Sequence, residues 1–167
     1  MSAIILNTPK DEVIGASLYA PVPCEDFYEV LLDVRSFPRW APGVRRVEVI
    51  EGPVGRGMVS EWEVSVLGVR RRVSSILVEA EPPSLLRWSY DGPVRGWGEC
   101  SIRERGSGAL VSFATGAEPE DPGLAILTRA APFRNAARAH LKRCLGRLGR
   151  LVSGDDGRIR VGPLERV

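Results

Sequence analysis

The chain has 167 residues, of which 44% are hydrophobic and 26% are charged, which is typical of one globular domain rather than a disordered chain. Its 23 Lys and Arg exceed its 21 Asp and Glu by only two, so no nucleic-acid partner is expected from overall charge. No apolar run reaches the roughly 18 residues that a membrane span needs. Residues 1–10 show no secretory leader, and three widely spaced cysteines suit free thiols, so a cytoplasmic location is expected.

The N-terminal part of the sequence predicts a strand followed by two short helices. Apolar residues mostly alternate over residues 12–20, as in a strand, and Pro21 and Pro23 end it. Residues 24–32 then have the three- and four-residue apolar spacing of an amphipathic helix. A second helical turn is expected at residues 36–40.

From residue 44 onward, apolar residues recur with a period of two, which predicts six further strands. Their expected ranges are 44–51, 58–66, 69–80, 86–90, 96–105 and 109–117. Glycine- and proline-containing segments separate most of them, as turns require.

The registers of two hairpins in this region can be counted from their turns. With Leu67-Gly68 as a two-residue turn, the first hairpin pairs Trp62 with Val73, Val64 with Arg71, Met58 with Leu77, Glu63 with Arg72 and Glu61 with Ser74. With Gly106-Ser107 as the turn, the second pairs Cys100 with Phe113, Ile102 with Val111, Ser101 with Ser112 and Arg103 with Leu110. One face of the sheet is therefore apolar and the other mainly polar, which indicates a cover on one side only.

A long C-terminal helix is expected to form that cover. Asp121-Pro122 is a typical helix start. An apolar stripe with helical spacing follows, made of Leu124, Leu127, Ala131, Leu141, Leu145, Leu148 and Val152. A helix of about 30 residues is roughly 45 Å long and could cross a whole sheet, although Pro132 should kink or split it. The predicted domain spans residues 12–152, and residues 153–167 are expected to be a C-terminal tail.

Together these elements predict an α+β fold. A curved antiparallel sheet of about seven strands would wrap around the long C-terminal helix, with two short helices after the first strand. A helix that lies across a curved sheet leaves space that neither element fills, so an internal cavity is expected.

Two segments, Ser17–Asp33 and Phe37–Val44, resemble the START-like (SRPBCC) superfamily in an acidic helix followed by an aromatic-Pro-x-Trp-x-Pro-x-Val turn. Within the superfamily the chain most resembles the polyketide cyclase/dehydrase and coenzyme Q-binding branch, over about residues 13–151. The resemblance implies a helix-grip fold that holds a hydrophobic ligand between sheet and helix. It leaves the function open, because this fold hosts lipid carriers, quinone binders, hormone receptors and aromatising cyclases.

Candidate ligand-binding residues lie mainly on the apolar face of the predicted sheet. They are Trp62, Val64, Arg71, Val73, Trp88, Tyr90, Cys100 and Phe113, with Phe133 from the helix. Aromatic residues there can fill a core or line a pocket for a planar or hydrophobic ligand. Arg71 needs a partner on an apolar face: it could reach the rim, pair with a carboxylate such as Glu79 or Glu99, or anchor a polar ligand group. Resemblance to aromatase/cyclases implies an interior arginine that polarises a polyketide carbonyl, and Arg71 is the nearest candidate.

Three further residues have more than one interpretation. Trp97 belongs on the polar face by strict alternation, unless Gly96 and Gly98 form a bulge that turns it towards the mouth of the pocket. Trp40 is expected to pack the short helices onto the sheet edge, and it could also border the entrance. His140, the only histidine, suits a helix surface better than general acid–base catalysis.

The sequence shows no metal or cofactor motif. Cys24, Cys100 and Cys144 lack metal-ligand spacing, and the Gly-x-Gly segments at 55–57 and 96–98 are not followed by the helix and lysine of a phosphate loop. No cofactor or metal is therefore expected, and no catalytic residue is assigned. The C-terminal helix carries a series of cations without an acid, which fits a solvated face or a contact with an anionic membrane or acidic partner: Arg134, Arg138, Lys142, Arg143, Arg147 and Arg150.

The preferred interpretation is the binding or transport of a hydrophobic small molecule such as a lipid, an isoprenoid quinone or a polyketide. The alternative is a polyketide aromatase/cyclase or dehydratase in which Arg71 and Tyr90 stabilise developing enolate charge in the same pocket. A third hypothesis is a regulatory module whose filled pocket signals that the ligand is present. The oligomeric state does not follow from the sequence.

Overall fold

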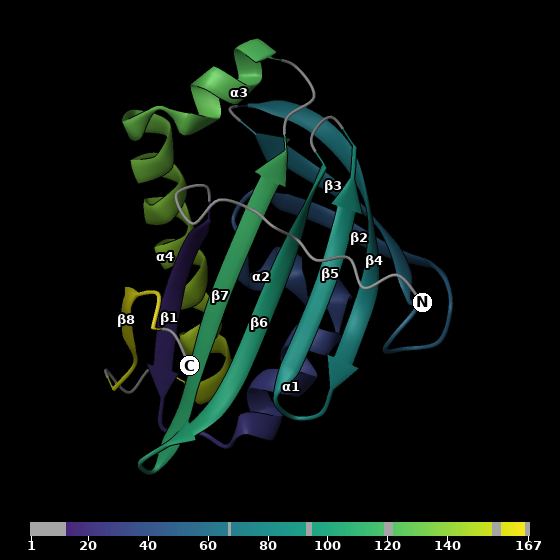
Figure 1. Cartoon of the computed structure of the whole chain (residues 1–167). Coiled ribbons are helices and arrows are strands. Elements are labelled where there is room, and N and C mark those ends of the chain that lie inside the picture. Colours follow the sequence, from purple (N-terminus) through teal and green to yellow (C-terminus); the bar gives the residue numbers. More distant parts are fainter. Residues whose placement is uncertain (1–12, 67, 93–94, 119–121, 155–157, 166–167) are drawn as a thin grey trace.

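The computed structural model describes residues 13–66, 68–92, 95–118, 122–154 and 158–165. In this part of the chain an antiparallel sheet curves around the C-terminal helix, as a helix-grip fold requires (Figure 1). The strands are β1 (Ile14–Ala20), β2 (Val44–Glu51), β3 (Val59–Val66), β4 (Val69–Glu81), β5 (Leu85–Asp91), β6 (Arg95–Arg105), β7 (Gly108–Glu118) and β8 (Arg160–Pro163). The helical elements are α1 (Cys24–Leu32), the 3₁₀ turn η1 (Val34–Ser36), α2 (Phe37–Trp40), α3 (Pro122–Arg129) and α4 (Ala131–Ser153). The predicted α+β class and helix-grip architecture are confirmed.

The order of strands in the sheet is β2-β3-β4-β5-β6-β7-β1-β8. Both counted hairpin registers are confirmed: Trp62 lies opposite Val73, and Cys100 lies opposite Phe113. Local turn chemistry explains this success, because Gly68 and Gly106 have φ values of 79° and 59°, in the left-handed region that favours glycine. Met58 precedes β3 but still faces Leu77, whose amide donates to the Met58 carbonyl at 3.0 Å.

The polar face of the first hairpin differs from the expected charge pairing in one detail. Glu63 lies opposite Arg72 in register, as predicted. Its carboxylate, however, forms its ion pair with Arg70, at 3.8 Å. A diagonal neighbour on the same face is within reach of long side chains, so register alone does not decide the partner.

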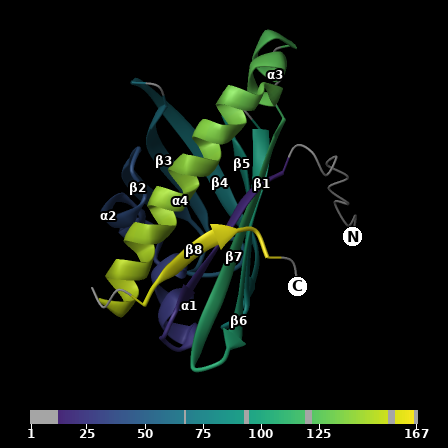
Figure 2. The same cartoon turned by 90° about the vertical axis from the view of Figure 1, so that its left-hand side faces the viewer.

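The predicted long helix is divided in two at Ala130, which has an extended backbone, just before Pro132 in the first turn of α4. The predicted effect of Pro132 is therefore confirmed, but the continuous apolar stripe is wrong. Leu127 on α3 is 50% exposed, whereas Leu145 and Leu148 on α4 are fully buried. In Figure 2, α4 runs diagonally across the sheet, and α3 continues in another direction beyond its upper end. Glu12, Leu67, Asp121, residues 155–157 and the Leu124 side chain lie outside what the structure describes.

The segment expected to be a tail contains β8, an eighth strand that the sequence did not reveal. β8 pairs antiparallel with β1, with Gly162 opposite Ser17. Its four residues include a glycine and a proline, and this run is too short to show a clear period of two.

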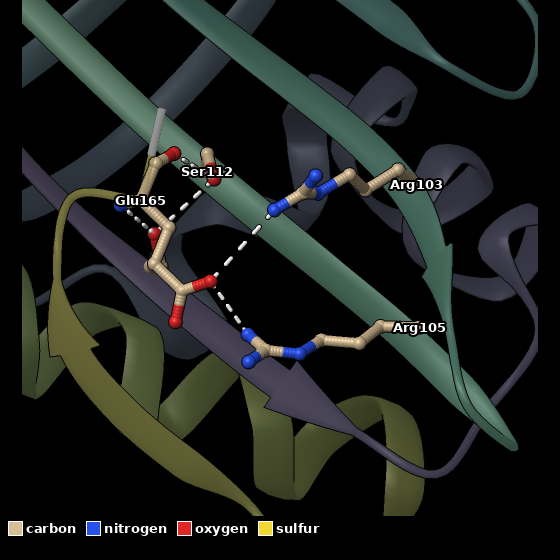
Figure 3. A network of polar contacts seen from close by, with 5 residues as sticks. Arg103, Arg105, Ser112 and Glu165 are labelled. Atoms are coloured by element: carbon tan, nitrogen blue, oxygen red, sulfur yellow. Dashed lines mark hydrogen bonds and ion pairs between the residues drawn. The ribbon is translucent and has the colours of Figure 1, made fainter. Parts of the chain in front are cut away.

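Polar contacts beyond β8 attach the C-terminal segment to the sheet (Figure 3). The Glu165 amide donates to Ser17 Oγ at 2.7 Å, and Ser112 Oγ donates to the Glu165 carbonyl at 3.1 Å. The Glu165 carboxylate forms ion pairs with Arg103 and Arg105 of β6. The segment thus joins three strands that lie side by side.

The core lies where α1 and the C-terminal half of α4 meet β1, β6 and β7. Its largest fully buried side chains include Leu18, Phe27, Leu145 and Leu148. We call these four residues, with Gly149, the packed end. Away from it, towards β3–β5, the helices and the sheet no longer meet, and the interior is hollow.

Candidate ligand-binding site

A cavity of about 360 Å³ lies between the inner face of the sheet, the α1–α2 segment and α4. Almost all of its lining is apolar, and among the residues that the structure describes no Asp, Glu, Lys, Arg or His contributes to it. The lining residues are Leu31, Leu32, Val34, Phe37, Trp40, Ala41, Val44, Met58, Ser60, Trp62, Val64, Val73, Ser75, Leu77, Leu86, Trp88, Tyr90, Phe113, Ala114, Thr115, Leu141 and Cys144.

Three aromatic residues form one wall of the cavity. The Phe37 ring centre lies 4.4 Å from that of Trp40 and 4.7 Å from that of Trp62, which it meets edge to face. Such edge-to-face contacts orient the rings. The buried Trp40 indole also donates to Ser36 Oγ at 3.4 Å, so this residue both packs α2 and lines the cavity.

Two more aromatic residues lie flat over glycines of the neighbouring strand. Trp88 of β5 covers Gly98 of β6, and Tyr90 covers Gly96; a Cβ at either glycine would be 2.2 to 2.3 Å from the ring. The register across Gly96 and Gly98 is continuous, so the bulge considered for Trp97 does not form. These glycines provide the space that lets the aromatic rings form the cavity wall.

The polar atoms of the cavity wall belong to neutral groups. Tyr90 donates its hydroxyl hydrogen to the Gly116 carbonyl at 3.1 Å. Burial raises the pKa of this phenol, although a hydrogen bond with Thr115 opposes the shift. Burial likewise raises the pKa of the Cys144 thiol to about 11, against the lowering effect of Arg143 and Arg147. Both groups are therefore protonated at neutral pH.

Six of the nine predicted ligand-binding residues line this cavity: Trp62, Val64, Val73, Trp88, Tyr90 and Phe113. Arg71, Cys100 and Phe133 do not. The six come from four different strands, and the confirmed β3–β4 and β6–β7 registers, with β5 paired between β4 and β6, bring them to one face.

Arg71 is exposed, and its guanidinium donates to the Arg70 carbonyl at 3.1 Å. Its register opposite Val64 is as predicted, but Val69 and Arg70 beside it are exposed as well, so this end of the hairpin reaches into solvent. The carboxylates considered as its partners, Glu79 and Glu99, instead both bind Arg87.

Cys100 and Phe133 are absent from the cavity lining. Cys100 is fully buried in the core, and burial raises the pKa of its thiol well above the usual value. Phe133 is half-buried in the first turn of α4, next to the exposed Ala131 and Pro132. Because this end of α4 is less buried than its last turns, Phe133 does not reach the lining.

The remaining candidates lie outside the lining. Trp97 stacks over Gly116 and borders a separate surface hollow with Ser74, Ile76 and Ser89. His140 is exposed on α4, where desolvation and the nearby Arg143 lower its pKa.

Apart from Trp40, which was considered for the entrance, sequence reasoning left the helical side of the cavity unassigned; Leu31, Val34, Phe37, Leu141 and Cys144 also line it. One signal was present: the turn at residues 37–44 carries two large aromatic side chains, which an exposed turn does not need.

No cluster of three or more His, Cys, Asp or Glu side chains in the described part of the chain could hold a metal ion. All three cysteines are free and buried. Among the described residues, no helix is both long enough and apolar enough to cross a membrane.

Residues 15–153 match the family described as polyketide cyclase / dehydrase and lipid transport. The chain therefore belongs to this family, and the expected START-like superfamily is confirmed. A comparison with curated protein sequences finds no significant match.

Solved structures with the same fold are similar to this chain at low sequence identity. A START superfamily protein from Mycobacterium smegmatis has a TM-score of 0.66 at 15% identity, over 83% of this chain and 98% of that one. The Zhui aromatase/cyclase from Streptomyces sp. R1128 has a TM-score of 0.64 at 18% identity, over 84% and 94%. The di-domain aromatase/cyclase StfQ from the steffimycin biosynthetic pathway has a TM-score of 0.70 at 17% identity, over 86% and 52%. Family and neighbours together support a hydrophobic-ligand-binding or polyketide cyclase role.

Proposed function

We propose that the protein binds and carries a hydrophobic small molecule, such as a lipid, an isoprenoid quinone or a polyketide, in the cavity between sheet and α4. The observation that carries this proposal is the lining, which combines aromatic walls with no charged side chain among the described residues. Burial of apolar surface is sufficient to hold such a ligand. The volume of about 360 Å³ lies within the range of small-molecule sites.

The chemistry of the lining favours binding over catalysis. A general acid or base works best with a pKa near the operating pH. The two titratable lining groups, Tyr90 and Cys144, have pKa values raised by burial, so neither exchanges protons readily at neutral pH. Arg71, the cation considered for carbonyl polarisation, lies outside the cavity.

Polyketide aromatase/cyclase or dehydratase is the second candidate, favoured by the family match and by the two aromatase/cyclase structures. In that case the cavity would fold a reactive chain, and Tyr90 would be the lining phenol that stabilises developing enolate charge. Tyr90→Phe would then abolish turnover of a poly-β-ketone substrate without loss of the fold. Unchanged turnover would exclude this role for Tyr90.

Native mass spectrometry with extraction of bound molecules tests the carrier proposal directly. A stoichiometric apolar ligand is expected from the wild-type protein. Ser75→Trp should displace it, because Ser75 is in the cavity wall, whereas Ser74→Trp on the next, exposed position should retain it. An empty wild-type protein that also binds no added lipid, quinone or polyketide would overturn the proposal.

We further propose that α3 and α4 dock the carrier on an anionic membrane surface. These helices carry seven Lys and Arg and no Asp or Glu, which leaves sixteen Lys and Arg against twenty-one Asp and Glu in the rest of the chain. Ile126 and Leu127 of α3 are 73% and 50% exposed. A helix pair that combines cations with exposed apolar side chains favours a lipid interface over a purely acidic protein partner. Leu141 and Cys144 of α4 line the cavity, so the docking helix is also a cavity wall.

Co-sedimentation with vesicles tests this surface. Vesicles with 30% anionic lipid should bind the protein at low salt, and neutral vesicles should not. Arg143→Glu/Arg147→Glu should abolish binding, whereas the same charge change at the exposed Arg56 and Arg72 should affect it little. Equal binding to neutral vesicles, or equal loss in both double variants, would contradict a specific docking surface.

A further inference from the structure

We infer that the hydroxyls of Ser60 and Ser75 are the polar anchor of the cavity and that they select ligands with a neutral carbonyl oxygen. The inference rests on the proposed function and specifies its ligand. It begins from an observation that packing alone does not explain: two serines are in a mostly apolar wall whose other hydroxyls, those of Tyr90 and Thr115, already donate to backbone carbonyls.

Ser75 is 9% exposed and lines the cavity from β4. Its hydroxyl forms no hydrogen bond with any described residue. In the described part of the chain, no polar side-chain atom is both completely buried and without a partner, so the Ser75 oxygen keeps some accessible surface. The hydroxyl therefore faces the cavity. An apolar ligand that displaces water from this hydroxyl leaves it unpaired, which costs free energy unless the ligand itself offers an acceptor.

Ser60 lies directly opposite Ser75 on β3 and is 3% exposed. Its oxygen accepts a hydrogen bond from Trp62 Nε1 at 2.8 Å. That bond uses one acceptor position of the hydroxyl and leaves its hydrogen free to donate. The hydrogen bond from Trp62 also fixes where the Ser60 oxygen lies.

Two donors on adjacent strands suit an oxygen that accepts two hydrogen bonds, as a carbonyl oxygen does. A carboxylate does not fit, because no cation lines the cavity in the described structure and a buried unpaired charge is costly. Tyr90 does not compete for the carbonyl as a donor, because its hydrogen is directed at the Gly116 carbonyl. The ligand class is therefore an apolar ketone, quinone or ester.

A matched pair of probes separates this anchor from general apolar binding. The probes are 2-acetylnaphthalene, which has a carbonyl, and 2-ethylnaphthalene, which has the same ring system without one. In calorimetric titrations, Ser75→Ala and Ser60→Ala should each reduce the affinity for the ketone about two- to tenfold, which corresponds to the loss of one hydrogen bond. Affinity for the hydrocarbon should stay the same or rise.

Ser74→Ala, on the neighbouring exposed position, is the control and should leave both affinities unchanged. The infrared band of the bound ketone, labelled with ¹³C at the carbonyl, is a second measurement. It should move to higher frequency in Ser75→Ala, because a hydrogen bond to the carbonyl is lost. Thermal unfolding checks that each variant is folded.

The outcomes distinguish the anchor from the proposed function. If Ser75→Ala reduces the affinity for both probes equally, or for neither, and leaves the carbonyl band unshifted, the proposed anchor is wrong and the apolar cavity still binds ligands. If the wild-type protein binds neither probe nor any extracted ligand, the proposed function is overturned, and the anchor with it.

Discussion

The two ends of the inner face of the sheet differ in how closely the helix approaches the strands. At the packed end, small residues bring α4 and β1 together: a Cβ on Gly149 would lie 3.1 Å from Leu18 Cδ1 and from Ile159 Cγ2. Ala16 and Ala20 of β1 are fully buried beside it. Here backbone elements approach until side chains interlock, and no space remains.

At the other end the side chains are larger, yet the interior is hollow. Phe37, Trp62 and Trp88 line the cavity, and contacts with each other or with backbone glycines hold them in the wall. Large residues therefore do not fill the space here; they form a rigid wall around it. The comparison shows that the separation of the backbone elements, rather than the size of individual side chains, decides where a helix-grip fold is hollow.

Truncation at the packed end should cost the most stability. Leu148→Ala removes a fully buried side chain from α4 and should reduce the free energy of unfolding by about 2–5 kcal/mol. Leu127→Ala, on the half-exposed α3 position, should change it by less than about 0.5 kcal/mol. Urea unfolding followed by circular dichroism measures both. Similar losses would mean that α3 packs as tightly as α4.

A methyl group placed under the aromatic wall should cost less. Gly98→Ala puts a Cβ 2.2 Å from the Trp88 ring, which must move, and about 1–3 kcal/mol should be lost. The near-ultraviolet signal of tryptophan should change with it. Gly162→Ala in β8 meets nothing within 4 Å and is the matched control, with an unchanged signal expected. An unchanged signal in Gly98→Ala would mean that the Trp88 ring does not depend on this glycine.

How far the sequence predicts the molecule depends on how local each feature is. The hairpin registers followed from glycine turns and alternation, both readable within about ten residues, and they placed Trp62, Val73 and Phe113 on one face. The helical side of the cavity was missed, because the distance between α4 and the sheet is set by contacts such as that of Gly149 with Leu18, which join residues far apart in the sequence.

Arg71 shows the limit of alternation. Its register is as predicted, but a face of a strand is buried only where another element covers it, and the end of this hairpin is exposed. β8 was missed for a different reason: a four-residue strand derives its stability from the edge of β1, not from a pattern of its own.

Removal of a large side chain from the cavity wall should cost less stability than Leu148→Ala. Trp62→Ala opens into existing space, so we expect a loss of about 1 kcal/mol instead of the roughly 3–5 kcal/mol of a tryptophan in a filled core. The variant should also accept larger ligands in native mass spectrometry. A loss as large as that of Leu148→Ala would show that this end is packed as tightly as the other.

The smallest effect concerns the C-terminal attachment seen in Figure 3 and depends on pH. The hydrogen bond from Arg105 lowers the pKa of the Glu165 carboxyl. Because the folded state has the lower pKa, the stabilisation is complete above the unfolded-state pKa and is lost as the pH falls through the folded-state value. Glu165→Gln should therefore weaken hydrogen-exchange protection of the β8 amides that pair with β1 at pH 6 and low salt.

At a pH below the lowered folded-state pKa, and so well below the ordinary glutamate value, the protection of wild type and Glu165→Gln should coincide, because the wild-type carboxyl is then protonated as well. The difference at pH 6 should also shrink at high salt, since the ion pair with Arg105 is exposed. Glu61→Gln, at an exposed position on β3, is the control and should not affect β8. No difference at pH 6 would mean that β8 is held by its strand pairing with β1 and the backbone contacts of Glu165 alone, and a difference that persists unchanged at low pH would mean that the ionised carboxylate is not its cause.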